Sequence, residues 1–269
     1  MEIKTVWSVY FSATGTTEKV VTTLAKTVAQ ELGAQYQTFS FNLPKSREDE
    51  LTFGPDDLVV MGVPVYAGRV PNLLLPYVRD KVKAQGALAI PVVLYGNRNF
   101  DDGLMELKNV MRDNGFMPVA AGAFVGEHSF STILGAGRPD ADDMALVDEL
   151  AHKAAEKVKG LTEAPTQAVE VEGCDPIRPY YTPRDRYGEP IKDFLKAKPK
   201  TDPDKCVKCG LCARLCPMGS IDPNDVSNVV GKCIKCCACV KKCPKGAKYF
   251  DHEGYLYHQH ELEDQYAGQ

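Results

Sequence analysis

CVKCGLCARLCP, at residues 206–217, and CIKCCACVKKCP, at residues 233–244, repeat one cysteine pattern at an offset of 27 residues. In each copy, two residues separate the first three cysteines, and the fourth follows after three residues and precedes a proline. Residues between the cysteines also correspond, as Arg214 does to Lys241. The repeat indicates a duplicated half-module with two pseudo-symmetric sites. This spacing is typical of thiolate ligands to [4Fe-4S] clusters.

Two other uses of clustered cysteines stay open, namely structural zinc in four-cysteine knuckles and a disulfide framework. Zinc sites need neither the third CxxC step nor the Cys-Pro ending, so iron-sulfur clusters are favoured. The runs resemble those of bacterial ferredoxins, which are small α+β domains. That resemblance implies crossed ligation, in which the fourth cysteine of each run binds the other cluster. The implied ligands are Cys206, Cys209, Cys212 and Cys243 for the first cluster, and Cys233, Cys236, Cys239 and Cys216 for the second.

Two of the ten cysteines lie outside this pattern. Cys237 directly follows the expected ligand Cys236, but its spacing to Cys233 is wrong for a ligand. We therefore expect Cys237 to pack against the cluster. Cys174 lies in a proline-rich stretch, and the sequence assigns it no role.

Residues 1–163 predict a separate α/β domain. Apolar strands alternate with amphipathic helices, which favours a parallel sheet covered on both faces. The first strand is followed at once by a hydroxyl-rich turn and a helical pattern through Leu32, the opening of a βαβ unit. The expected strands cover residues 3–10, 35–41, 58–62, 86–96 and 118–127, and further helices cover residues 71–83, 102–114 and 140–159.

The loop at residues 12–17 has the most specific chemistry in this domain. In a doubly wound sheet, ligands bind beyond the carboxyl ends of the strands. The loop lacks the Walker lysine and the G-x-G-x-x-G pattern, so neither an ATP cradle nor a dinucleotide site is supported. It offers four hydroxyls and backbone N–H groups at a helix N-terminus, which suit a phosphomonoester. The alternative is helix capping, which needs one hydroxyl.

The motif S-x-T-G-x-T after the first strand resembles the FMN phosphate loop of flavodoxins. This resemblance implies a flavodoxin-like, doubly wound, five-stranded sheet in the order 2-1-3-4-5, with one bound FMN. Taken as a whole, the chain resembles the flavodoxin-ferredoxin fusion proteins of anaerobic bacteria and archaea. The implied FMN-binding residues lie in three loops and are Ser12, Ala13, Thr14, Gly15, Thr16, Thr17, Pro64, Val65, Tyr66, Ala67, Gly68, Tyr95, Gly96, Asn97, Arg98 and Asp101.

One departure from many flavodoxins concerns the flavin ring, which they hold between a tryptophan and a tyrosine. The only tryptophan here is Trp7, inside the first strand, where we expect it in the core. Tyr66 and Tyr95 are the available stacking residues, with ordinary packing as the alternative. Gly68 is the candidate to meet flavin N5 through its backbone. For His128 we favour a satisfied loop histidine over gating of substrate or donation to the flavin.

The remaining sequence predicts a linker, a basic module and an acidic tail. Residues 164–200 contain six prolines, so we expect a docked strap that fixes the distance between flavin and clusters. Residues 201–250, the ferredoxin domain, hold eight Lys and one Arg against four Asp, a formal +5. Residues 251–269 either fold back on this module or form a solvated, partly disordered end. Its three histidines are expected at the surface: His252, His258 and His260.

These features predict an electron-transfer protein that links FMN to two [4Fe-4S] clusters in anaerobic metabolism. The alternatives are a flavin-dependent reductase of a small acceptor, such as a quinone or nitro compound, and a sensing protein that has lost its flavin. Expected partners are redox proteins of ferredoxin or flavoprotein type, without nucleic acid or membrane, while homodimerisation stays open. The start of the chain lacks a signal peptide and no 18-residue apolar run occurs, so we expect a cytoplasmic protein.

Overall fold

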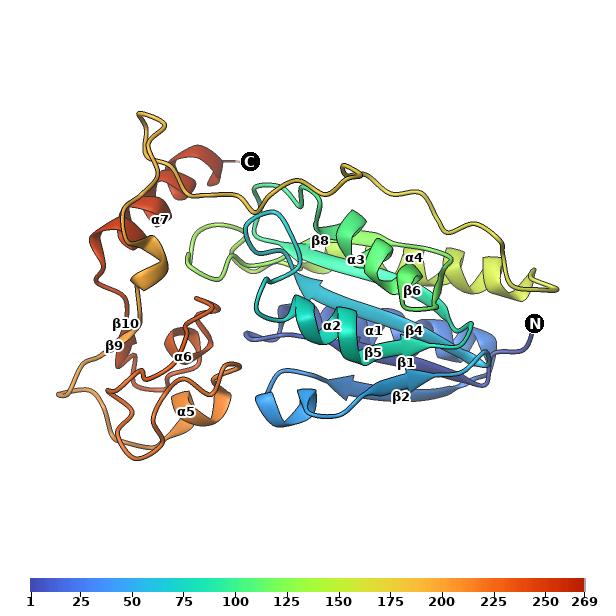
Figure 1. Ribbon diagram of the computed structural model, residues 1–269, viewed down its shortest axis with the longest axis horizontal. Coiled ribbons are helices and arrows are strands. Elements are labelled where there is room, and N and C mark those ends of the chain that lie inside the picture. Colours follow the sequence, from blue (N-terminus) through green and yellow to red (C-terminus); the bar gives the residue numbers. More distant parts are fainter. Residues whose placement is uncertain (269) are drawn as a thin grey trace.

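The chain forms two bodies joined by a long extended segment (Figure 1). The computed structural model describes residues 1–268. The larger body contains a six-stranded parallel sheet with helices on both faces, and the smaller body contains the two cysteine runs. Within residues 1–268, no helix is long and apolar enough to cross a bilayer.

The main sheet has the order β2-β1-β4-β6, and β7 and β8 both pair with the outer side of β6. All these pairs are parallel. Counting β7 and β8 as one interrupted strand, this is the predicted order 2-1-3-4-5, so the predicted fold class is confirmed. The strands are β1 (Thr5–Tyr10), β2 (Gln35–Ser40), β4 (Asp57–Pro64), β6 (Leu88–Tyr95), β7 (Met117–Pro118) and β8 (Gly122–Val125).

A bulge explains why the single strand expected at residues 118–127 is divided. Pro118 pairs with Ala89, and Gly122 pairs with Val92. The outer strand therefore uses one more residue than β6 over the same length, as in a β-bulge. The carbonyl of Val119, inside the bulge, accepts a hydrogen bond of 2.8 Å from the Lys157 ammonium. The extra residue was not visible in the sequence pattern.

The helix expected at residues 71–83 is shorter than predicted. Helix α2 covers Leu75–Lys81, and the chain then continues as strand β5 (Val82–Ala84). Strand β5 pairs in parallel with β3 (Leu51–Phe53), which the sequence analysis missed. This pairing supplies hydrogen-bond partners to backbone groups that a longer helix would have satisfied internally.

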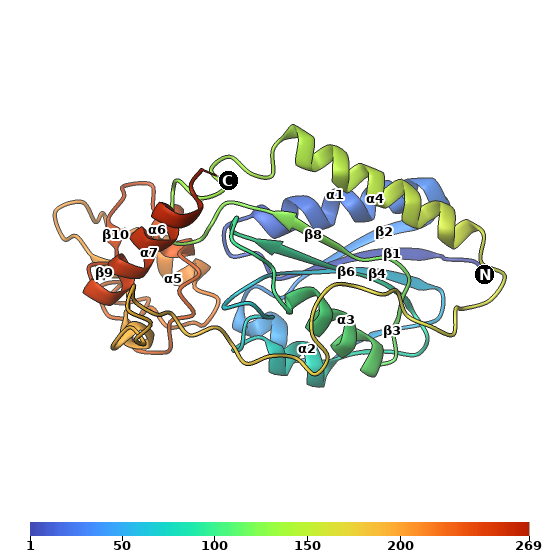
Figure 2. The same ribbon diagram turned by 90° about the horizontal axis from the view of Figure 1, so that it is seen from above.

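The sheet is covered by two helices on each face (Figure 2). Helices α1 (Thr16–Leu32) and α4 (Ala141–Lys159) pack on one face, and α2 and α3 (Gly103–Asp113) on the other. Successive residues of β4 alternate between the two cores, with Val60 in one and Val59 and Met61 in the other. This alternation is the two-residue period of a strand that is buried on both faces.

The smaller body has little regular structure beside its cysteines. Two short strands pair antiparallel, and two short helices follow equivalent positions of the two cysteine runs. These elements are β9 (Lys200–Thr201), β10 (Lys248–Tyr249), α5 (Leu211–Leu215) and α6 (Ala238–Lys241). Outside the module, the described residues form the 3₁₀ turns η1 (Pro44–Arg47) and η2 (Phe194–Lys196).

Residues 164–199, here named the strap, connect the two bodies. The strap leaves the end of α4, passes α3 and reaches the smaller body (Figures 1 and 2). It contacts α3 closely, because a Cβ atom on Gly173 would lie 2.5 Å from that of Met105. Its backbone also bonds the larger body, with Val169 N donating to Pro118 O at 2.9 Å and Tyr181 N donating to Ala67 O at 2.8 Å.

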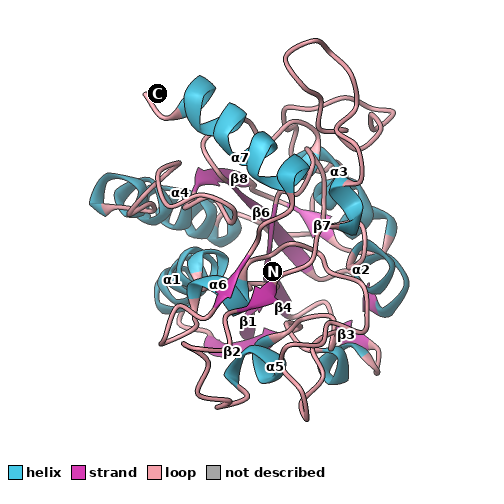
Figure 3. Ribbon diagram, turned by 90° about the vertical axis from the view of Figure 1, so that its left-hand side faces the viewer, coloured by secondary structure: helices cyan, strands magenta, loops and turns pink. Residues whose placement is uncertain are grey.

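The C-terminal segment is a helix, α7 (Glu253–Tyr266), so the expectation of a solvated, partly disordered end is wrong for these residues. Tyr255 stacks on Phe250 with ring centroids 4.2 Å apart, and His258 and Leu262 are also buried. His258 therefore contradicts the prediction of a surface histidine, whereas His260 is exposed. The apolar face of α7 could be recognised only once its partners were known. Figure 3 shows α7 and the smaller body in front of the carboxyl ends of the sheet.

Candidate functional site

The eight cysteines of the two runs line two cavities. The first cavity measures about 420 Å³ and the second about 390 Å³, counting the solvent at their mouths. Within residues 1–268, no three His, Cys, Asp or Glu side chains converge tightly enough to hold a single metal ion. The thiols surround two open spaces, and a polynuclear cluster needs such a space. The first cavity is lined by Cys206, Cys209, Cys212 and Cys243, and the second by Cys216, Cys233, Cys236 and Cys239, which also borders the first.

The two cysteine runs share their backbone conformation. Lys208 and Lys235 occupy equivalent positions and have left-handed φ angles of 52° and 58°. Gly219 and Gly246, after the two Cys-Pro steps, have φ angles of 59° and 58°. The left-handed residues turn the chain around each cavity, so the sequence repeat is also a repeat of geometry.

Cys237 takes the place that Gly210 has in the first run. Both residues precede a short helix in left-handed conformation, with φ angles of 56° and 72°. The Cys237 thiol borders the second cavity and lies 3.3 Å from the Tyr255 hydroxyl. Burial raises the pKa of Cys237 to about 12. This geometry favours a packing role for Cys237 over a ligand role.

Backbone N–H groups point at the thiols that end each run. Ser220 N donates to Cys216 Sγ and Ala247 N donates to Cys243 Sγ, both at 3.3 Å. For Cys243, burial opposes ionisation, but the N–H donors prevail and lower its pKa. Burial raises the pKa of Cys236 to about 12, so metal coordination is what would ionise this thiol. Thiols grouped around each space, with N–H donors to sulfur, fit a [4Fe-4S] cluster.

The loop at residues 12–17 connects β1 to α1 at the carboxyl edge of the sheet. Ser12 Oγ accepts a hydrogen bond from Glu18 N at 3.0 Å, and Ser12 N donates to Asn42 Oδ1 at 2.6 Å. Gly15 begins α1 with a φ angle of 110° and has no side chain to cap it, so the Ser12 hydroxyl supplies the acceptor for the first turn. Ser12 and Thr17 are buried, while Thr14 and Thr16 are half-exposed. A helix N-terminus with hydroxyls beside it fits an FMN phosphate.

The loop at residues 64–71 forms a tight turn beside this edge. Tyr66 N donates to Arg69 O at 2.9 Å, and Arg69 N donates to Tyr66 O at 3.2 Å. Ala67 and Gly68 have left-handed φ angles of 52° and 79°. A Cβ atom on Gly68 would lie 2.8 Å from Asp101 Oδ2, so the two neighbouring loops touch where only glycine fits.

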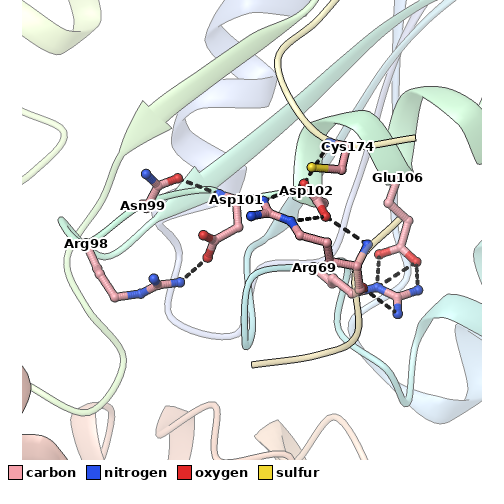
Figure 4. Close-up of polar contacts among 8 residues, drawn as sticks. Arg69, Arg98, Asn99, Asp101, Asp102, Glu106 and Cys174 are labelled. Carbon is pink, nitrogen blue, oxygen red and sulfur yellow. Dashed lines mark hydrogen bonds and ion pairs between the residues drawn. The ribbon is translucent and has the colours of Figure 1, made fainter. Parts of the chain in front are cut away.

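The loop at residues 95–101 completes an arrangement that we name the flavin rim, made of residues 12–17, 64–71 and 95–101. The Tyr95 ring packs 5.6 Å from that of Phe100. Arg98 and Asp101 form an ion pair within the loop (Figure 4). Asn97 has a φ angle of 65°, and its side-chain amide donates to Tyr266 O of α7 at 3.0 Å. The structure thus brings the three predicted loops together at one edge.

A sequence model of the 4Fe-4S binding domain family matches residues 199–222, which include the first cysteine run. Together with the flavodoxin strand order, this match decides the architecture. The chain is a fusion of a flavodoxin-like domain and a ferredoxin-like module. No curated protein matches the chain.

Several solved structures are similar to the flavodoxin domain at low identity. A flavodoxin from the domain Archaea is 16% identical, with a TM-score of 0.41, over 58% of this chain and 99% of its own. The two-electron reduced flavodoxin of Megasphaera elsdenii is 21% identical, with a TM-score of 0.38, over 56% and 98%. Apo NADH:FMN oxidoreductase is 15% identical, with a TM-score of 0.41, over 60% and 91%. Because TM-scores this low do not support a conclusion, we assign the fold from the strand order.

The second cavity of the ferredoxin module lies against the flavin rim. Ile234, between the cavity residues Cys233 and Cys236, packs on an apolar core of the flavodoxin domain. Burial raises the pKa of Tyr66 well above its ordinary value, and the charges of nearby Cys236 and Cys237 act in the same direction. Tyr66, expected to stack on the flavin, is therefore also the rim residue beside this cavity.

Lys241 clamps the module to the flavodoxin domain. Its ammonium forms an ion pair with Glu127 and donates to the carbonyls of His128 and Ser131 at 2.6 and 3.0 Å. The Lys241 side chain is only 16% exposed. The sequence shows that Lys241 repeats Arg214 but gives no sign of this contact, because it joins residues more than 100 positions apart.

Asp102 and Glu106 anchor the strap beside the rim (Figure 4). The Asp102 carboxylate, 1% exposed, accepts hydrogen bonds from Cys174 N at 2.9 Å and from the Arg178 backbone and guanidinium at 2.7 to 2.9 Å. Glu106 pairs with Arg69, whose guanidinium lies 4.2 Å from the Tyr180 ring centroid. The sequence shows both acids only as residues at the start of a helix, so it gave no signal of this role.

His128 packs into the interface between the two bodies. A Cβ atom on Gly96 would lie 2.3 Å from the His128 ring, and His128 Nδ1 accepts a hydrogen bond from Phe130 N at 3.2 Å. Burial, followed by the positive charge of Lys241, lowers the pKa of His128 to about 4. The imidazole is therefore neutral at pH 7, as fits a satisfied loop histidine.

Proposed function

We propose that this protein transfers electrons between one FMN and two [4Fe-4S] clusters, one near the flavin and one remote from it. The carrying observation is the position of the second cavity, whose Ile234 packs on the flavodoxin core and whose cysteines lie near Tyr66 of the flavin rim. When bound, FMN exchanges electrons in pairs and singly, whereas each cluster exchanges one, so the chain would join two-electron and one-electron chemistry.

In this proposal the flavin rim binds FMN. The start of α1 and the hydroxyls of residues 12–17 hold the phosphate, while residues 64–68 and 95–101 hold the ring. Tyr66 and Tyr95 are the proposed ring contacts, and Gly68 offers its backbone to the flavin edge. The close contact between Gly68 and Asp101 supports this assignment, because it fixes the two ring loops relative to each other.

The cysteine assignment is part of the same proposal. The first cluster would take Cys206, Cys209, Cys212 and Cys243, and the second cluster would take Cys216, Cys233, Cys236 and Cys239. The grouping of thiols around the two cavities supports crossed ligation. Lys241 and the strap would keep the second cluster at a fixed distance from the flavin, and a short distance matters because tunnelling rates fall steeply with separation.

Cofactor analysis after anaerobic purification tests the proposal. We expect about eight irons and one FMN per chain, with EPR signals from two interacting reduced clusters. Cys209→Ser should lose the first cluster, whereas Cys174→Ser, outside both cavities, should keep all iron. Thr14→Val with Thr16→Val should weaken FMN binding by about tenfold or more, and Thr22→Val on the outer surface of α1 should not. An intact protein that binds no flavin would refute the proposal.

The alternative, a flavin reductase with its own small substrate, is less well supported. The strap, the module and α7 all contact the rim or its neighbouring loop, so this chain itself occupies much of the approach to the flavin. Steady-state turnover of quinones or nitro compounds without a protein partner distinguishes the two functions. Rapid turnover by the purified holoprotein would favour the reductase.

A further inference from the structure

The two cysteine runs have equivalent surfaces with different neighbours. In the second run, Ile234 packs on the flavodoxin domain and Lys241 binds Glu127. The equivalent residues of the first run are Val207, which is 60% exposed, and Arg214, which is also exposed. The same module face therefore docks a protein domain at one copy and is open to solvent at the other.

The lysines at equivalent positions show the same contrast. Lys235 is 6% exposed and its ammonium donates to Leu195 O at 3.0 Å. Its counterpart Lys208 is exposed at the mouth of the first cavity. Two more exposed lysines, Lys242 and Lys245, line that cavity, and the cavity residue Cys209 is itself exposed. We name the surface of Val207, Lys208 and Arg214 the open face.

Charge indicates what kind of protein fits the open face. The side chains of residues 201–250 sum to a formal +5 within a chain of −4, but two clusters of about −2 each would offset most of this excess. The local cations therefore decide the charge of the open face, which contains Lys208 and Arg214 and lies beside Lys242 and Lys245. The domain that docks on the second run is part of an acidic remainder, and it offers a carboxylate to Lys241. A partner on the open face would offer carboxylates to Arg214 and Lys208 and an apolar contact to Val207.

We propose that the open face is the docking surface for an acidic one-electron carrier protein, which approaches the first cluster as the flavodoxin domain approaches the second. The assignment rests on the proposed function, since the first cluster would be the carrier's electron donor or acceptor. Lys208 and Arg214 would steer the encounter, and Val207 would supply the apolar centre of a small, transient interface. The flavin would then exchange electrons with this carrier through both clusters.

Affinity measurements on the iron-loaded protein test the docking surface without relying on turnover. The probes are a strongly acidic [2Fe-2S] ferredoxin and, with opposite charge, cytochrome c. Binding of the ferredoxin should weaken steeply between low and high salt. The double variant Lys208→Glu with Arg214→Glu should weaken it by about tenfold or more and strengthen binding of cytochrome c. Stopped-flow electron transfer should show the same changes.

A matched control reverses two exposed lysines on the outer helices, Lys26→Glu with Lys153→Glu, and should leave ferredoxin binding unchanged within about twofold. Iron content and EPR signals of both variants must equal those of the parent. If the double variant Lys208→Glu with Arg214→Glu loses iron, ferredoxin binding is measured instead with Lys208→Gln and Arg214→Gln, and the salt dependence is measured with the unaltered protein. Equal effects of both pairs, or affinity independent of salt, would overturn the docking surface. If the unaltered protein self-associates and the double variant Lys208→Glu with Arg214→Glu does not, the partner on the open face is a second copy of this chain rather than a carrier.

An absent cofactor and an absent docking surface give different results. Loss of the proposed function appears as missing iron or FMN in the parent protein. Loss of the docking surface appears as full cofactor content with no response of ferredoxin affinity to the charges of Lys208 and Arg214.

Discussion

The flavodoxin domain buries an apolar cluster on each face of its sheet, whereas the cluster beside the ferredoxin module is small and joins Cys237 to Ala197 of the strap and Tyr255 of α7. The module also contains the two thiol cavities. Hydrophobic burial alone can therefore stabilise the first body, while the second also needs its metal centres and its contacts with the first. Removing the iron or one of these contacts should therefore affect the two bodies differently.

The largest effect is expected from removal of iron. Chelation should raise amide hydrogen exchange in residues 201–250 to nearly that of an unfolded chain, because cluster binding supplies the folding free energy of the module. The strands β1 and β4 should stay protected, since their core contains no cysteine ligand. Mass spectrometry of exchanged peptides measures both regions. Persistent protection of the module after complete iron loss would contradict this prediction.

The clamp at Lys241 should have the next largest effect. Lys241→Met removes the charged donor to Glu127, His128 and Ser131, and we expect docking of the module to weaken by about 1–3 kcal/mol. Electron transfer from photoreduced flavin to the clusters should slow, with both cofactors still bound. Lys242→Met, one position along and exposed, is the matched control. Equal rates in both variants would show that Lys241 does not set the distance.

The substitution Asp102→Asn should weaken docking of the strap on the flavodoxin domain. Hydrogen bonds from the Arg178 side chain are the main cause that holds the pKa of Asp102 below its ordinary value, so the carboxylate stabilises strap docking at neutral pH. The substitution should raise hydrogen exchange in residues 173–181, as should lowering the pH below the ordinary carboxyl pKa of about 4. Asp113→Asn, at an exposed pair with Arg112, is the control. No change in exchange would exclude Asp102 as the anchor.

Docking of α7 should weaken at acid pH. Burial lowers the pKa of His258 to about 4, with Arg98 acting in the same direction, so protonation favours the undocked state. The contribution of α7 is complete above the ordinary histidine pKa of about 6.5 and declines as the pH falls toward 4. Opening of α7 should increase by up to about tenfold per pH unit in this window. His258→Phe should reduce that dependence; an unchanged pH profile would assign it to His128 or other groups.

The smallest effect is expected at Cys237. Cys237→Gly relieves a left-handed backbone position but loses the contact with Tyr255, so the two terms should nearly cancel, within about 1 kcal/mol. Iron content should stay at about eight per chain. A fall to about four irons would instead make Cys237 a ligand and contradict its packing role.

Local patterns were enough to predict a parallel sheet and the first helix, while the strand order came from the resemblance to flavodoxins. The left-handed turns at Lys208 and Lys235 follow from cysteine spacing, which acts over a few residues. The split of the fifth strand, the pair β3 and β5, and helix α7 were not predicted, because each depends on partners distant in sequence. Helix α7 is the clearest case: His258 belongs to a segment that looks polar until Phe130 and Phe194 are placed beside it.

The sequence by itself determined the chemistry: eight cysteines at cluster spacing and a hydroxyl-rich loop after the first strand. Only the tertiary structure decided which cavity faces the flavin rim and which face of the module stays open. Ile234 and Val207 are alike in sequence and in their place in the repeat, yet one is packed and the other exposed. The reason is physical, because ligand spacing is a short-range property of the chain, while burial depends on which other elements pack against it.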